Sequence, residues 1–181
     1  MLVSLFLPLL FQLASPVPLE AGNWWEYREL AREKTGAIWS ATELTTRFEV
    51  RSTARGLFIR QIGGADPAPG PAELGENWIR LAPWTGEEAL PLPLVVGRVG
   101  RGPGEALEGW RVEAEEAVEV PAGQFSALRC ALRTRTLESL LWIVPGVGVV
   151  KETQGSPGQP PDLERELVTW SGAPPPPPDA P

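Results

Sequence analysis

An alternation of apolar and polar side chains with a period of two residues constrains the fold of this chain most strongly. It is clearest in residues 40–52, where one set of alternate positions is apolar or threonine and the other is mainly charged. Successive side chains of a β-strand point to opposite faces, so this segment is predicted to be a strand with one buried and one solvent-facing side. The buried side would carry Thr42, Leu44, Thr46, Phe48 and Val50.

The same pattern occurs on both sides of a predicted turn at residues 121–124. Proline presets φ at Pro121 and glycine accepts a positive φ at Gly123, which suits a tight turn. The two flanking strands are therefore predicted to pair as an antiparallel hairpin with apolar positions facing each other. The inward set would be Trp110, Val112, Ala114, Val118 and Val120 before the turn, and Leu128, Cys130 and Leu132 after it.

Two registers of this hairpin satisfy the pattern. One sets Glu115 across from Arg129, and the other sets Glu113 across from Arg133. Either ion pair would be exposed and would contribute about 0–1 kcal/mol. Glu116 falls on the inward parity, where a lone buried carboxylate is costly. We expect either that a bulge or an opening of the sheet exposes it to solvent, or that it is the polar group at the bottom of a ligand cavity.

Short strands separated by glycine- and proline-containing turns account for most of the chain. Residues 140–144 are apolar on both parities, which predicts a strand covered on both faces. About nine or ten strands and no long helix are expected. The predicted fold is all-β: a single antiparallel curved sheet or half-barrel, with a β-sandwich as the alternative. Residues 63–76 and 97–109, rich in glycine and proline, are predicted to be surface loops or lids over a cavity mouth.

Composition narrows the functional classes. The chain has 181 residues, 43% of them hydrophobic, which is enough for one domain with a core. A net charge of −7 argues against nucleic acid as a partner. The chain has no histidine, the commonest general base and transition-metal ligand, and no metal or cofactor is predicted. Cys130 is the only cysteine, so it cannot form an intrachain disulfide, and it is predicted to be a small buried hydrophobe.

The two ends differ in composition from the middle. Residues 2–14 form a broken apolar run with the length of a signal-peptide core, too short to span a bilayer comfortably. We predict a signal peptide at residues 1–14, a single antiparallel β domain at residues 15–171 and a proline-rich disordered tail at residues 172–181. The alternatives are an uncleaved anchor or buried first strand at one end, and a spacer or docking tail at the other. The mature chain is expected to be exported and to carry no transmembrane span.

Two motifs resemble a family signature. Residues 120–125 read VPAGQF, and residues 142–151 read WIVPGVGVVK. Together they resemble the signature VPAG-x-F … W-x-x-PGVG-x-V-K of poorly characterised exported bacterial proteins, although Ile143 stands where an aromatic is usual. That resemblance implies an antiparallel half-barrel similar to the LolA/LolB-like lipoprotein carriers, located in the periplasm or cell envelope.

The candidate site is the concave inner face of the predicted sheet. No catalytic residue is predicted, because a histidine base and a Ser-x-x-Lys motif are both missing and the clustered glutamates follow one strand instead of facing each other across a cleft. The chain is predicted to be non-enzymatic and to bind a lipid, another apolar or amphipathic ligand, or a hydrophobic segment of an envelope protein. The alternatives are a structural or interaction module of the cell envelope with a solid core, and an unrecognised hydrolase. The predicted ligand-binding residues are Leu44, Phe48, Trp110, Glu116, Leu128, Leu132 and Trp142.

Overall fold

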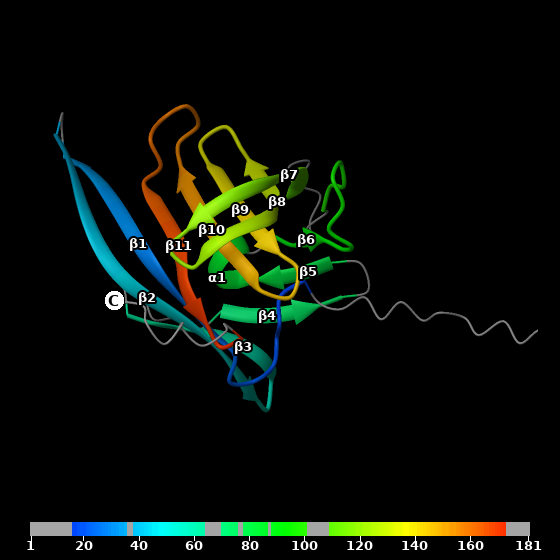
Figure 1. Cartoon of the computed structure of the whole chain (residues 1–181). Helices are drawn as coiled ribbons and strands as arrows, with labels where there is room; N and C mark the ends of the chain where they lie inside the picture. The colour runs from blue at the N-terminus through cyan, green and yellow to red at the C-terminus, as the bar shows by residue number, and fades with distance from the viewer. Residues whose placement is uncertain are drawn as a thin grey trace, which may run out of the picture.

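The computed structural model describes residues 16–35, 38–63, 70–75, 78–86, 88–100 and 109–172. The predicted signal peptide at residues 1–14 and residues 173–181 of the predicted tail lie outside these residues. The described chain consists of strands and one short helix (Figure 1). Its elements are β1 (Trp24–Thr35), β2 (Ile38–Thr53), β3 (Gly56–Ile62), β4 (Gly70–Leu74), β5 (Trp78–Leu81), α1 (Ala82–Thr85), β6 (Leu90–Pro91), β7 (Arg111–Val120), β8 (Gly123–Arg133), β9 (Glu138–Val144), β10 (Gly148–Gly155) and β11 (Leu163–Trp170).

All eleven strands belong to one antiparallel sheet with the order β6-β5-β4-β3-β2-β1-β11-β10-β9-β8-β7. The prediction of an all-β fold with a single antiparallel curved sheet is therefore confirmed, and the sandwich alternative is not adopted. Strands β1 and β11 pair in the middle of the sheet, so the first and last strands join its two halves. The loop prediction for residues 63–76 was partly wrong, because β4 occupies Gly70–Leu74 and pairs with β3 and β5.

The sheet curls into a nearly closed barrel whose seam is bridged by residues 97–100. Val99 forms an isolated antiparallel bridge with Arg111. The Gly100 amide donates to the Trp110 carbonyl at 2.7 Å, and the Val112 amide donates to the Arg98 carbonyl at 2.9 Å. A Cβ added at Gly100 would lie 2.5 Å from the Ala89 carbonyl oxygen, next to β6. The missing side chain of Gly100 therefore lets the backbones on the two sides of the seam approach each other.

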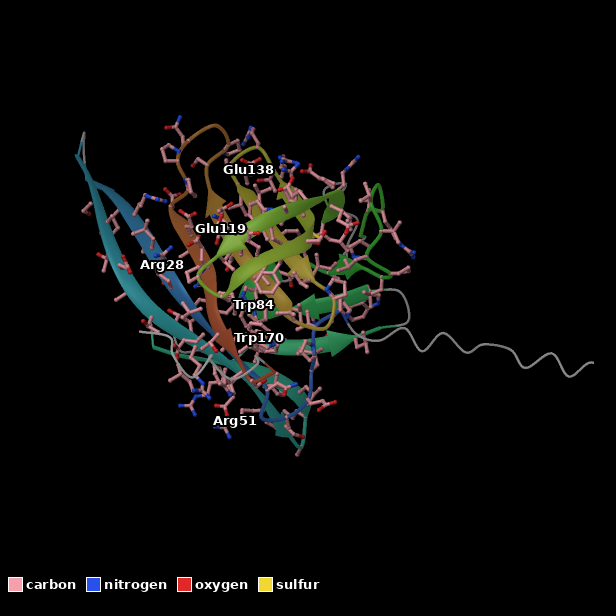
Figure 2. All side chains as sticks on the ribbon, in the orientation of Figure 1. Arg28, Arg51, Trp84, Glu119, Glu138 and Trp170 are labelled. Carbon is pink, nitrogen blue, oxygen red and sulfur yellow. The ribbon has the colours of Figure 1, made fainter. Side chains whose placement is uncertain are left out.

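An aromatic cluster fills part of the barrel interior. The ring centroids of Phe48 and Trp84 are 4.9 Å apart, and those of Trp25 and Trp84 are 5.8 Å apart with nearly perpendicular planes. Tyr27 packs edge-on against Phe48 and donates its hydroxyl hydrogen to the Val149 carbonyl at 2.6 Å. The short helix α1 carries Trp84, which is labelled near the centre of Figure 2. These rings bury a large apolar area at preferred aromatic geometries.

The hairpin of β7 and β8 forms at the predicted turn but in neither predicted register. Glu115 lies opposite Leu128, and Ala114 lies opposite Arg129. A register shift between Val112 and Ala114 inserts one extra residue, so the strand changes which parity faces the interior. The prediction that Val112, Ala114 and Val118 share one face was therefore wrong.

The inserted residue of this bulge is Glu113. Its carboxylate pairs with both Arg133 and Arg129, the second at 3.3 Å. The Glu113–Arg133 ion pair expected from one predicted register thus forms, but through the bulge instead of through a regular ladder. These contacts hold the pKa of Glu113 below its ordinary value, chiefly through the hydrogen bond from Arg133.

Candidate functional site: a cavity at one end of the barrel

A cavity of about 270 Å³ lies beside α1, at the end of the barrel where β8 connects to β9 and β10 connects to β11. Its wall combines apolar side chains with several buried polar groups, and it occupies one end of the barrel instead of the whole predicted concave face. The residues that line it are Ala82, Pro83, Trp84, Thr85, Gly86, Trp110, Leu132, Leu137, Ser139, Glu152 and Gln154.

A buried ion network lies behind this wall. Arg165 donates from Nε to Glu29 Oε2 at 2.7 Å and from Nη1 to Glu152 Oε2 at 2.9 Å. Thr46 donates its hydroxyl hydrogen to the same Glu29 oxygen at 2.9 Å. All four side chains are buried. Strand register brings them together, because Arg165 is the cross-strand partner of Glu29 on one side and of Glu152 on the other.

Glu152 is the member of this network that also lines the cavity. Burial raises the pKa of its carboxyl group above the ordinary value, although the neighbouring Arg165 guanidinium opposes that shift. A single guanidinium serves two buried carboxylates, so Arg165 offsets the burial of Glu152 only in part. The cavity therefore presents an acidic group that binds a proton more readily than an exposed glutamate does.

Two tryptophans in the cavity wall carry buried indole N–H groups without a hydrogen-bond partner among the described residues. These are Nε1 of Trp84 and Nε1 of Trp110, whose residues are 4% and 1% exposed. By contrast, Trp25 Nε1 donates to the Val147 carbonyl at 2.6 Å, and Trp142 Nε1 donates to Glu116 Oε1 at 2.8 Å. A buried donor without a partner costs about 1–3 kcal/mol, so an acceptor that reached either indole nitrogen would bind favourably.

The structure brings together only part of the predicted ligand-binding set. Trp110 and Leu132 line the cavity, and Phe48 lies in the core against Trp84. Leu128 is half-buried against the core. Leu44 is 40% exposed, because it belongs to residues 40–45 of β2, which are all exposed and lie outside the packed interior.

Glu116 and Trp142 lie on the opposite face of the sheet from the cavity. Leu141 and Ile143 are buried in the core, so Trp142 between them points the other way. The Glu116 carboxylate accepts hydrogen bonds from Trp142 and from Arg129, the latter at 3.1 Å. The placement of Glu116 and Trp142 on the concave face is therefore corrected: the bulge at Glu113 turns Glu116 outward, where it is fully paired.

Sequence reasoning missed the three charged residues of the interior. A signal was present in the alternation, because Arg165 shares its parity with Leu163 and Leu167, and Glu29 shares its parity with Trp25 and Tyr27. A charged residue at such a position predicts a buried and paired side chain. The partners could not be identified, since Glu29 and Arg165 are 136 residues apart in the sequence.

Other chemistry is limited in the part of the chain that the structure describes. Cys130 is buried, and burial raises the pKa of its thiol to about 12, with a smaller contribution from Glu113. The thiol is therefore protonated at neutral pH and is a poor nucleophile. Within the described ranges, no group of three or more metal-ligating side chains comes together, and no helix has the length and apolar character needed to cross a membrane.

Two solved structures are similar to this chain. A predicted lipoprotein from Parabacteroides distasonis aligns with a TM-score of 0.50 and 13% identity, over 86% of this chain and 97% of its own length. A predicted exported protein with a YmcC-like fold from Bacteroides fragilis aligns with a TM-score of 0.46 and 10% identity, over 85% and 97%. No protein-family model and no curated protein matches the sequence. The first likeness supports the fold, and the family signature in the two turn motifs stays a prediction.

Proposed function

We propose that this chain is an exported, non-enzymatic β-barrel protein that binds a small, uncharged amphipathic molecule with hydroxyl oxygens at the end cavity. The observation that carries the proposal is that Trp84 and Trp110, two residues with buried and unpartnered indole N–H groups, line the same cavity as Glu152. Ligand oxygens would accept from the indoles, and a ligand hydroxyl would donate to Glu152. Leu132 and Leu137 would contact the apolar part of the ligand.

The size and charge of the cavity favour this ligand class. A volume of about 270 Å³ is close to the lower limit for small-molecule pockets, so it suits a small molecule or the polar end of a longer one. A complete lipid would not fit, because the aromatic cluster around Phe48 and Trp84 fills the neighbouring interior. Glu152 disfavours an anionic ligand, since its own cationic partner Arg165 is already shared with Glu29.

Export and the non-enzymatic role rest on separate observations. The apolar run at residues 2–14 supports export, as does the likeness to the Parabacteroides distasonis lipoprotein. Binding is favoured over catalysis because the Glu152 carboxylate is engaged by Arg165, and the hydroxyl oxygen of Thr85 in the cavity wall accepts a hydrogen bond from the Leu81 amide.

The proposal can be tested with indole N–H resonances. The ¹⁵N-labelled full chain is titrated with octyl glucoside below its micelle concentration, and the Trp84 and Trp110 resonances are assigned from Trp84→Phe and Trp110→Phe. We expect saturable shifts of these two resonances, and no such shifts with octanoate. Each phenylalanine variant keeps an apolar ring but lacks the donor, so its affinity should fall about three- to tenfold.

Trp142→Phe is the matched control, because its indole already donates to Glu116 on the opposite face. It should bind octyl glucoside as the native chain does. If neither cavity resonance moves, or if the Trp142 resonance moves equally, ligand binding at this cavity is wrong. The filled aromatic interior would then favour the second candidate function, an envelope interaction module without a ligand.

A further inference from the structure

A second, separate feature lies at the turn between β2 and β3. A shallow hollow of about 470 Å³ covers the outer face of this hairpin. Its wall is almost entirely apolar in exposed area, yet three of its six residues are arginines. The residues that line it are Arg51, Thr53, Ala54, Arg55, Phe58 and Arg60.

Strand pairing explains why an aromatic ring lies among these cations. Arg51 and Phe58 are direct cross-strand partners, and Arg60 follows Phe58 on the same parity. The other parity faces the core, where Val50 and Ile59 are fully buried. Phe58 is only half-buried, so the outer face of the hairpin presents an apolar centre with a cationic rim.

The charge of this hairpin differs in sign from that of the whole chain. Residues 47–60 contain four arginines and one glutamate, a net charge of +3, whereas the complete chain carries −7. Arg51 pairs with the one glutamate, Glu49, at 2.9 Å. Among the described residues, no carboxylate forms an ion pair with Arg55 or Arg60. Elsewhere, Arg28, Arg129, Arg133 and Arg165 are all paired with carboxylates.

We propose that the outer face of the β2–β3 hairpin docks the protein on a membrane surface that contains anionic phospholipids. Arg51, Arg55 and Arg60 would contact lipid phosphates, and the apolar hollow at Phe58 would take the glycerol and upper acyl region. The turn of this hairpin protrudes from the body of the barrel, and Figure 2 labels Arg51 near that end.

Charge complementarity and the apolar centre together favour an anionic membrane surface as the partner. Arginines attract an anionic lipid surface, and the effect decreases within a Debye length, so it depends on salt. The apolar hollow favours a lipid surface over nucleic acid, because a phosphate backbone offers no acyl chain to fill it. An acidic peptide is the remaining competitor, and the experiment distinguishes it.

The test is co-sedimentation of the full chain with phosphatidylcholine vesicles, with and without about one third phosphatidylglycerol, at low and at physiological salt. We expect tighter binding to the anionic vesicles, weakened by salt. Neutral vesicles measure any uptake that does not depend on charge. The variant R51Q/R55Q/R60Q should bind anionic vesicles about 100-fold more weakly, since each arginine contributes about fivefold.

R98Q/R111Q/R135Q is the matched control, because it removes the same charge from three exposed arginines outside the hairpin. It should keep most of the binding, and equal melting temperatures should establish that both variants fold. Phe58→Ala should weaken binding to anionic vesicles at both salt concentrations, because it removes apolar contact.

Three results would overturn the proposal. Equal binding of the native chain to neutral and anionic vesicles would remove the role of the arginines. Equal losses in the two triple variants would assign the effect to net charge alone. Displacement from vesicles by a soluble glutamate-rich peptide at concentrations comparable to the lipid phosphate would indicate a protein partner in place of a membrane. The end cavity shares no residue with this hairpin, so the proposed function stands or fails separately.

Discussion

Arg165 illustrates how a single side chain determines the polar interior of this barrel. It is buried and forms ion pairs with Glu29 at 2.7 Å and Glu152 at 2.9 Å. A buried ion pair adds little net stability when it is complete, but removal of one partner leaves charge uncompensated in a poorly solvated interior.

Replacement of Arg165 by methionine tests this at the residue scale. We expect the free energy of unfolding to fall by about 3–5 kcal/mol, because two buried carboxylates lose their shared cation. Urea denaturation at neutral pH measures the change. The control is Arg28→Met, which removes an exposed ion pair with Glu166 and should leave the unfolding midpoint nearly unchanged. Equal effects of the two substitutions would contradict a special role for Arg165.

Glu152 leads to a prediction about pH. Burial raises its pKa above the ordinary value of 4.5, which the unfolded chain keeps. The folded protein therefore binds this proton more tightly, so its contribution to the free energy of unfolding increases as the pH falls from neutral toward 4.5. In Glu152→Gln this contribution is lost.

The stability difference between the native chain and Glu152→Gln should thus change with pH. Urea denaturation at about pH 7 and about pH 5 should show the native chain gaining relative to the variant at the lower value. Glu113 and Glu166 titrate in the opposite sense, since both pKa values are lowered, but they are common to both proteins and cancel in the difference. A difference that is constant with pH would contradict a raised pKa at Glu152.

At the scale of elements, the seam between β6 and β7 depends on residues 97–100. Gly100 lies where an added Cβ would be 2.5 Å from the Ala89 carbonyl oxygen and 3.0 Å from Pro91 Cδ. Gly100→Ala should therefore lower the free energy of unfolding by about 1–3 kcal/mol, because the backbone must move to relieve the overlap.

Amide hydrogen exchange locates this effect. The Val112 amide donates across the seam to the Arg98 carbonyl, so it should exchange faster in Gly100→Ala than in the native chain. Val99→Ala is the control, since Val99 is 44% exposed and its substitution should change stability by less than about 0.5 kcal/mol. Unchanged exchange at Val112 would show that the seam does not depend on this contact.

At the scale of the whole molecule, β11 joins the two halves of the sheet. It pairs with β1 on one side and with β10 on the other. A chain that ends at Pro161 lacks this strand and Arg165, and should give no cooperative thermal transition by circular dichroism. A chain that ends at Gly172 keeps all described strands and should melt as the full chain does. Cooperative melting of the shorter chain would contradict the central role of β11.

How far the sequence predicts this structure varies from one feature to another. The alternation in β2 is confirmed by the burial of Thr46, Phe48 and Val50, because strand periodicity is a local property of consecutive residues. The predicted burial of Thr42 and Leu44 was wrong, since both are exposed. The turn at residues 121 and 122 is also confirmed, because a tight turn depends only on a few consecutive residues. The bulge at Glu113 could not be predicted, since a register shift appears only when the strand meets its partner.

The candidate site was predicted only in part, through Trp110 and Leu132. Its polar residue Glu152 and the ion-pair partner Arg165 behind the wall come from strands whose pairing cannot be read from the sequence. By itself the sequence determined most of the strands and turns, although not β4, and which parity of most strands is apolar, because these depend on neighbours one or two positions away. Only the tertiary structure decided the register, the closure of the barrel and the meeting of Glu29, Glu152 and Arg165, because those depend on contacts between residues far apart in the chain.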